Sequence, residues 1–259
     1  AALPVPGANA LDQCRQPLDA YLLLGIEPDR DVAVPACALA ALESSRGVIA
    51  LTGFRSPVLD RVATIQLPIA LHAENEGSFL NAQGQCQTFT GAVKPPGLSR
   101  PAWKILRALG DQLSLDGFDA VSVGDVTGEF QTLQLTRSEN QSPMPHPEPM
   151  PHEAKALQLL LTVPMFSADS LVRRSDALQL TPHVADEEVR LSQITLAELG
   201  LEDGSSCYVR TGAGTATGTL VADSRTPDGV VWIKASSNLA IVCDANSTCT
   251  LEAVPGVPT

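Results

Sequence analysis

The 259-residue sequence has few aromatic residues, few basic residues and no long apolar run. Aromatics make up 4% of the chain, and 17 Lys and Arg stand against 29 Asp and Glu, giving a formal net charge of −12. An acidic chain without a basic cluster repels phosphate backbones, and sparse aromatics offer little base stacking, so we expect no nucleic-acid binding. No apolar run reaches the roughly 18–20 residues of a membrane span, so we expect no direct membrane insertion.

Cysteine spacing that would bind a metal or an iron–sulfur cluster is also missing. No CxxC and no Cys/His cluster occurs among the six cysteines, which are Cys14, Cys37, Cys86, Cys207, Cys243 and Cys249. Zinc and iron–sulfur sites need such pairs. Cys243 and Cys249 form either a disulfide or, as we favour for a cytoplasmic chain, a reduced pair. We therefore predict no metal site and no cluster in this chain.

Common catalytic motifs are absent as well. There is no G-x-S-x-G sequence, and the four histidines, His72, His146, His152 and His183, have no partner that the sequence identifies. The stretch "GAGTATG" at 212–218 superficially resembles a phosphate-binding loop, but a strand-like segment follows it instead of a helix. We interpret it as the tip of a hairpin, and we predict no catalytic residue.

The first half of the chain alternates apolar runs with a helical segment. The run at 19–29 predicts a parallel strand covered on both faces, and 35–45 predicts an alanine-rich helix. Residues 47–54 and 63–71 predict two more strands. The order strand–helix–strand implies a right-handed crossover, so we predict part of a doubly wound parallel sheet.

Residues 100–113 predict a further helix. Pro101 suits its first position, and four apolar residues fall on one face: Trp103, Leu106, Leu109 and Leu113. Five prolines between 137 and 154 then indicate a linker or an extended arm. Metal binding by His146 and His152 in that arm is the less favoured alternative.

The remainder of the chain has the pattern of a compact β-barrel. Short apolar runs alternate with Gly and Asp turns, including "DG" at 203–204 and 228–229. Ser192 or Thr195 can cap a short helix that ends at Gly200. We therefore expect the fold class α/β plus β, divided into an α/β domain (1–136), a Pro-rich linker or arm (137–165) and a barrel domain (166–259).

Residues 72–97, "HAENEGSFLNAQGQCQTFTGAVKPPG", gather carboxylates, amides and glycines after an apolar strand. Four candidate ligand-binding residues lie here: Glu74, Gly77, Asn81 and Gly84. Gly77 and Gly84 permit positive φ or close backbone approach. Glu74 and Asn81 can accept hydrogen bonds from backbone N–H groups. We predict a loop that keeps its shape through local bonds as scaffold; the alternative is a ligand site.

The same stretch and its flanks resemble the molybdopterin oxidoreductase superfamily. Its pattern of L-P, E-x-x-G-(S/T), N-x-x-G-R-x-Q and R-P-x-W is matched by Leu67, Pro68, Glu74, Gly77, Ser78, Phe79, Asn81, Gly84, Gln87, Arg100, Pro101 and Trp103. Residues 21–32, 93–110 and 171–181 are similar to the large iron–sulfur subunit, also called the G subunit, of bacterial NADH–quinone oxidoreductases (complex I). The C-terminal stretch resembles a double-psi β-barrel.

The resemblance implies a C-terminal portion of such a subunit, as a fragment, a processed chain or one piece of a split gene. Its expected role is structural: it would support electron transfer from NADH to quinone without a redox group of its own. Iron–sulfur clusters are expected in the N-terminal part of the subunit, outside this chain. The implied partners are other peripheral-arm subunits, and the implied location is the cytoplasmic side of the bacterial inner membrane.

Two departures from the superfamily pattern bear on the cofactor. Gln85 stands where the family has Arg, and Thr64 stands where an Asp is common. Because phosphate groups prefer basic donors, the loss of that Arg leads us not to expect molybdopterin. The alternative is part of a molybdopterin-dependent enzyme of the formate dehydrogenase or nitrate reductase type, with the pterin between the two domains. A third alternative is a free-standing binding module, against which a large exposed apolar face would argue.

Overall fold

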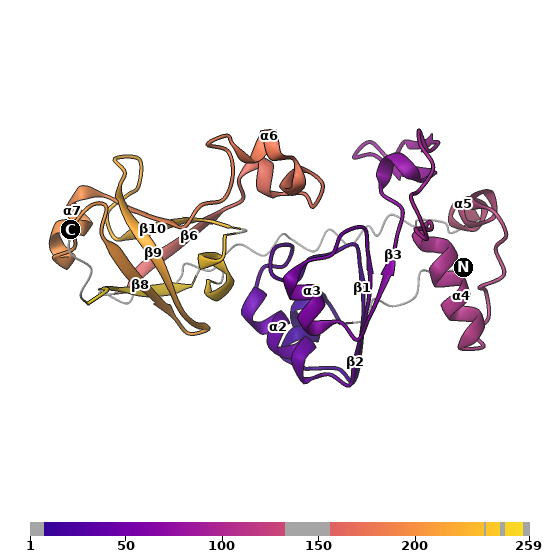
Figure 1. The fold of residues 1–259 in the computed structure, drawn as a ribbon, viewed down its shortest axis with the longest axis horizontal. Helices are drawn as coiled ribbons and strands as arrows, with labels where there is room; N and C mark the ends of the chain where they lie inside the picture. The colour runs from indigo at the N-terminus through magenta and orange to yellow at the C-terminus, as the bar shows by residue number, and fades with distance from the viewer. Residues whose placement is uncertain (1–7, 133–155, 236, 244–246, 256–259) are drawn as a thin grey trace.

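The computed structural model describes residues 8–132, 156–235, 237–243 and 247–255. They form an elongated molecule with a β-barrel at one end, an α/β layer in the middle, and a hairpin with two helices at the other end (Figure 1). The predicted metal alternative at His146 and His152 lies outside the described residues. Within the described part of the chain, no helix combines the length and the apolar character that a membrane span requires.

The α/β layer is a three-stranded parallel sheet in the order β1-β2-β3. Its elements are α1 (Ala10–Arg15), β1 (Ala20–Leu24), α2 (Pro35–Ser44), β2 (Gly47–Thr52), α3 (Pro57–Val62) and β3 (Ile65–Pro68). Leu23, Val48 and Ala50 pack against apolar side chains of α2 and α3. The predicted strands, their parallel pairing and the helix over 35–45 are confirmed.

One prediction about β1 was wrong. We expected both faces of this strand to be covered, yet Leu22 and Leu24 are each 49% exposed while Leu23 is buried. Successive side chains of a strand point to opposite faces. Side chains of α2 and α3 join the cluster of Leu23 and cover that face of the sheet. On the other face, the described residues leave Leu22 and Leu24 half exposed, although Leu51 of the middle strand is buried.

The second part contains η1 (His72–Glu74), β4 (Gly77–Leu80), β5 (Cys86–Phe89), α4 (Ala102–Gln112) and α5 (Val123–Thr132). The expected loop at 72–97 is thus largely an antiparallel β4–β5 hairpin. Pro101 is the N-cap of α4 instead of its first residue, and Leu113 lies past its end, 69% exposed, off the predicted apolar face. Gly110 lets Phe118 approach, since an added Cβ would lie 2.1 Å from the Phe118 ring.

The third part is a closed barrel of six strands in the order β10-β6-β11-β8-β9-β7. Its elements are β6 (Leu157–Thr162), η2 (Met165–Ser167), η3 (Val172–Arg174), α6 (Asp176–Gln179), β7 (Glu188–Leu191), α7 (Gln193–Leu199), β8 (Ser206–Thr211), β9 (Gly214–Ala222), β10 (Val230–Lys234), η4 (Leu239–Val242) and β11 (Thr248–Ala253). The barrel includes β6, which falls inside the range 137–165 expected to be linker and pairs with β10 and β11.

Several local predictions in the barrel are confirmed. Ser192 caps α7 by accepting a hydrogen bond from the backbone N–H of Thr195, and Gly200 ends the helix with φ 66°. The stretch 212–218 belongs to the β8–β9 hairpin. The barrel interior also holds three cysteines in the thiol form, Cys207, Cys243 and Cys249. Burial raises the pKa of Cys207 to about 11 and that of Cys249 to about 12, so both stay protonated core groups at neutral pH.

Two glycines of "GAGTATG" allow a matched test of the barrel packing. A Cβ at Gly218 would lie 2.5 Å from a Val189 methyl and 3.0 Å from the carbonyl oxygen of Glu187, whereas a Cβ at Gly212 would meet nothing within 4 Å. Gly218→Ala should therefore lower the free energy of unfolding by about 1–3 kcal/mol through overpacking. Gly212→Ala should change it by less than about 1 kcal/mol in the same urea titration. Equal effects would show that this packing is described incorrectly.

Candidate functional site

The four candidate residues lie on η1 and the β4–β5 hairpin, and they are held by local contacts. One Glu74 carboxylate oxygen accepts a hydrogen bond from the Leu71 backbone N–H at 2.9 Å. The Asn81 amide oxygen accepts from the backbone N–H groups of Gln83 and Gln85 at 3.0 and 2.9 Å. Gly84 has φ 80°. The predicted local hydrogen bonds are therefore confirmed.

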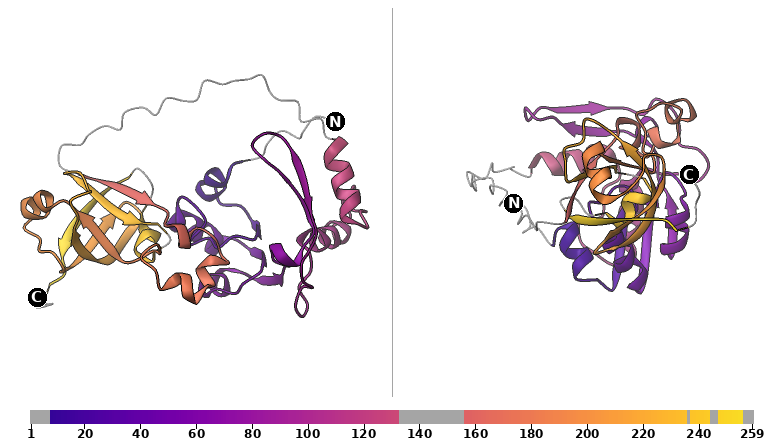
Figure 2. Two further views of the ribbon diagram at one scale, coloured as in Figure 1. Left: turned by 90° about the horizontal axis from the view of Figure 1, so that it is seen from above. Right: turned by 90° about the vertical axis from the view of Figure 1, so that its left-hand side faces the viewer.

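The hairpin is stabilised by its own side chains as well. Rings of His72, Phe79 and Phe89 lie 4.9–5.6 Å apart between centroids, and a Cβ at Gly77 would lie 3.3 Å from the Phe89 ring. Figures 1 and 2 place the hairpin at the far end of the molecule from the barrel. A ligand role for Glu74, Gly77, Asn81 and Gly84 stays an alternative.

A polar cleft lies elsewhere, where the carboxyl end of β1 meets the segment that precedes β7. Its volume is about 420 Å³, and its lining is Glu27, Asp29, Arg30, Ser56, Pro57, Ser167, Arg173, Arg174, Gln179, Ala185, Glu187 and Ser237. Figure 2 shows the segment with η2, η3 and α6 between the sheet and the barrel. Crevices at the carboxyl ends of parallel strands are where open α/β sheets bind ligands.

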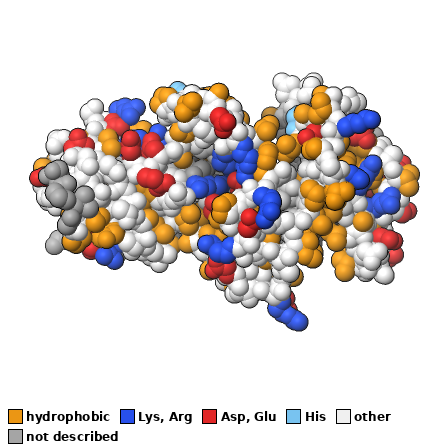
Figure 3. All heavy atoms as spheres, viewed as in Figure 1, with side chains coloured by type: hydrophobic (Ala, Val, Ile, Leu, Met, Phe, Trp, Pro, Cys, Tyr) orange, Lys and Arg blue, Asp and Glu red, His pale blue; other side chains and the backbone are white. Residues whose placement is uncertain are grey.

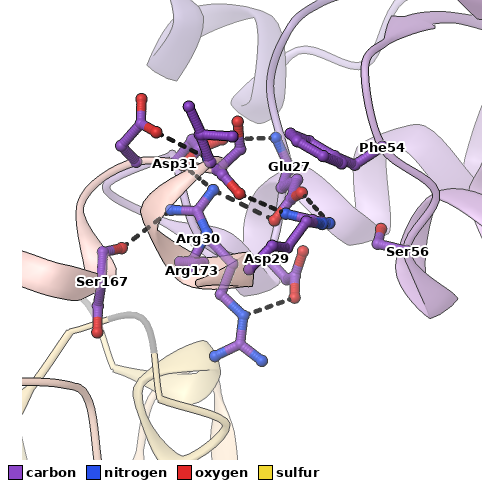
Figure 4. A network of polar contacts seen from close by, with 12 residues as sticks. Glu27, Asp29, Arg30, Asp31, Phe54, Ser56, Ser167 and Arg173 are labelled. Carbon is purple, nitrogen blue, oxygen red and sulfur yellow. Dashed lines mark hydrogen bonds and ion pairs between the residues drawn. The ribbon is translucent and has the colours of Figure 1, made fainter. Parts of the chain in front are cut away.

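Arg173 is the centre of the contacts in this cleft (Figure 4). Its guanidinium donates to an Asp31 carboxylate oxygen at 2.9 Å and to a Glu27 oxygen at 3.2 Å. It also donates to the Ser167 carbonyl oxygen at 3.0 Å. The side chains of Arg173 and Glu27 are only 11% and 9% exposed, so this is a nearly buried ion pair between segments far apart in sequence.

Two more arginines complete the charge network. The Arg174 guanidinium lies 2.5 Å from the second Glu27 oxygen, in an ion pair whose geometry is not that of a hydrogen bond. The same guanidinium lies over the Phe54 ring, 4.3 Å from the ring centroid. Arg30 pairs with Asp29 at 3.0 Å and donates to the Asn238 amide oxygen at 2.8 Å. The last contact joins the end of β1 to η4 of the barrel.

This arrangement does not fit a phosphate-bearing pterin, which the superfamily resemblance would place between the two domains. Arg173, Arg174 and Arg30 each face a carboxylate of the protein itself. One Asp29 carboxylate oxygen is buried with no hydrogen-bond partner, which adds negative charge to the cleft. A phosphate group would have to displace these carboxylates from the arginines, at a cost of leaving buried charge unpaired.

The sequence interpretation missed this cleft. Residues 21–32 and 171–181 carried the family resemblance, and no role was assigned to their charged side chains. A usable signal was present, because Glu27, Asp29 and Asp31 follow an apolar parallel strand, where polar residues gather at the sheet edge. The pairing itself could not be foreseen, since Glu27 and Arg173 are 146 residues apart.

A second charged cluster stabilises the barrel rim. Asp186 accepts bonds from Arg190 at 2.9 and 3.1 Å and from the Lys234 ammonium group at 2.5 Å. Arg190 also lies 5.2 Å from the Trp232 ring centroid. Burial raises the pKa of Asp186, but the bonds from Arg190 and Lys234 outweigh this effect and leave the pKa below its usual range.

Comparison with known proteins shows which family the first part of the chain is similar to. Residues 5–112 match the molybdopterin oxidoreductase family model. In structure, the chain is similar to acetylene hydratase from Pelobacter acetylenicus, with a TM-score of 0.58 and 18% identity over 83% of this chain and 37% of that one. At that identity the likeness concerns the fold alone. Residues 5–112 of this chain are thus similar to the molybdopterin oxidoreductase family.

Two curated relatives that match most of the chain indicate a particular subunit. The chain is 30% identical to the G subunit of NADH-quinone oxidoreductase from Streptomyces coelicolor over 86% of its length, which is 26% of the relative. It is 29% identical to the protein of the same name from Mycobacterium bovis, over 85% of this chain and 27% of the relative. The resemblance to this large subunit is thus confirmed, and the chain spans about a quarter of the length of these relatives.

Removing the central cation should destabilise the junction between sheet and barrel. Arg173→Met leaves Glu27 and Asp31 short of a partner, and breaking a buried pair in this way costs about 3–5 kcal/mol. We expect a matching loss in urea unfolding, with the sheet and barrel losing their common transition. The control Arg55→Met removes a pair in which the arginine is 81% exposed, and it should cost under about 1 kcal/mol. Comparable losses in both variants would contradict the assignment.

Acid should weaken the barrel through Asp186. Folding lowers the pKa of Asp186 below its ordinary value of 3.8. The ionised carboxylate therefore contributes fully to the stability of the folded state above pH 3.8, and this contribution is lost as the pH falls through the lower pKa of the folded state. Asp186→Asn should therefore reduce the loss of stability below about pH 4, and Lys234→Met should reduce it in part. Thermal unfolding from about pH 2 to about pH 6 measures both; an unchanged slope in Asp186→Asn would refute the linkage.

Proposed function

We propose that this chain is a structural portion of the large peripheral-arm subunit of a respiratory NADH:quinone oxidoreductase. Its role is to hold the cluster-bearing modules of that subunit and the neighbouring subunits in place. It supports electron transfer from NADH to quinone without a redox group of its own. The similarity to the two bacterial G subunits over most of the chain supports the assignment to that complex.

The observation that carries the structural role is the self-neutralised cleft. Arg173 and Arg174 are both held by Glu27, and Arg30 is held by Asp29. These contacts fill the place of an anionic ligand with the protein's own carboxylates and tie the sheet to the barrel. Fixed spacing between redox groups requires rigid support, and a nearly buried ion-pair network across a junction supplies it.

We further propose that the barrel has the double-psi topology. Six strands close on themselves, and the two parallel pairs β6–β10 and β7–β9 interrupt an otherwise antiparallel ring, which supports this topology. The division at 1–136, 137–165 and 166–259 stays a proposal, except that β6 within the second range belongs to the barrel. The proposed partners are other peripheral-arm subunits, at the cytoplasmic side of the inner membrane.

The proposal makes a direct prediction about composition. The purified chain should contain neither iron nor molybdenum in stoichiometric amount and should show no visible absorbance of a cluster. Metal analysis and an absorption spectrum of the protein, expressed with iron and molybdate supplied, test this. Molybdenum or iron at about one atom per chain would contradict the structural role, and molybdenum would favour the molybdopterin-enzyme alternative.

A further inference from the structure

The face of the α/β sheet opposite α2 and α3 carries two aliphatic rows. The parallel register aligns Leu22, Ile49 and Ile65 in one row across β1, β2 and β3. The next row on the same face contains Leu24, Leu51 and Leu67. We call these six residues the aliphatic face. The opposite face carries Leu23, Val48 and Ala50, which α2 and α3 cover.

The aliphatic face is open to solvent at its β1 and β3 edges, whereas Leu51 in the middle strand is 1% exposed. Leu22, Leu24 and Ile65 are each 49% exposed. Figure 3 shows hydrophobic side chains gathered between the lobe of the sheet and the lobe that contains α4 and α5. Parallel sheets are normally covered on both faces, and a contiguous exposed apolar patch marks an interaction site.

The edge of the sheet beside this face is open too. Across residues 8–132 and the later described ranges, β1 pairs with β2 alone, so its other side presents unpaired backbone N–H and C=O groups. At the opposite edge, the end of β3 is followed by a bridge between Ile69 and Arg100. The open backbone edge and the aliphatic face therefore meet at β1.

The topology indicates what covers them. The chain moves from β1 to β2 to β3 in one direction, and both connecting helices pack on the same face. Because crossovers in parallel sheets are right-handed, a helix reaches the other face when its strand is added on the far side of β1. The described chain supplies no such strand, whereas the Streptomyces coelicolor G subunit has about three quarters of its length outside the match.

We propose that β1 and the aliphatic face bind a parallel strand and an amphipathic helix from the part of the large subunit that this chain does not match. The inference rests on the proposed function, because it takes the occupant from the same large subunit. The strand would pair with the open edge of Ala20–Leu24. The helix would place its apolar side on Leu22, Leu24 and Ile65, in the manner of a doubly wound sheet.

The test is co-expression with a defined probe, the part of the Streptomyces coelicolor G subunit outside the region matched by this chain. Affinity is measured for the wild-type chain, for Leu22→Glu and for Ile65→Glu, with circular dichroism to confirm folding of each. Leu180→Glu is the matched control, because Leu180 is 89% exposed and does not belong to the aliphatic face. Hydrogen exchange of the peptide containing residues 20–24 reports on the edge.

We expect the wild-type chain and Leu180→Glu to bind the probe, and both sheet variants to bind at least about tenfold more weakly. Amides at 20–24 should gain protection in the complex. Binding that neither sheet variant weakens overturns this inference and leaves the proposed function standing. Self-association of the wild-type chain that Leu22→Glu abolishes assigns the face to a second copy and also overturns it. No binding of the probe by the wild-type chain overturns this inference. Stoichiometric molybdenum in addition overturns the proposed function as well.

Discussion

The nearly buried ion pair between Arg173 and Glu27 is the contact on which the arrangement of the molecule depends. It connects the loop after β1 to the segment before β7, and Asp31 and Arg174 extend it on either side. Removing one partner of such a pair leaves charge uncompensated in a place that water reaches poorly. The sheet and the barrel each have a hydrophobic core. They are joined by this charge network and by Ile241 of η4, which packs against the core of the sheet.

The same contacts determine what the cleft can do. It occupies the position where open α/β sheets bind ligands, and it has the arginines that a phosphate group would require. Each of those arginines faces Glu27, Asp29 or Asp31, and an Asp29 oxygen stays buried without a hydrogen-bond partner. The cleft is therefore a junction whose cations are neutralised by the protein's own carboxylates.

Much of the fold could be predicted from local pattern. Apolar runs indicated β1 to β3, and Ser192 and Gly200 marked the ends of α7, because caps and strands depend on neighbours in sequence. The hydrogen bonds of Glu74 and Asn81 were predictable for the same reason. The exposure of Leu22 and the Glu27–Arg173 pair could not be predicted, because both depend on contacts between elements that are far apart in the sequence. The placement of β6 in the barrel required pairing with β10, some 70 residues away.

The arginines of the cleft serve the protein and not a phosphate-bearing ligand, and this is the claim most worth measuring. Calorimetric titration of inorganic pyrophosphate into the purified chain tests it most directly, with Glu27→Gln/Asp31→Asn as the variant that frees the arginines. We predict no saturable binding to the wild-type chain below about 1 mM and measurable binding to the variant. One-to-one binding to the wild-type chain at about 10 μM or tighter, lost in Arg173→Met, would contradict it.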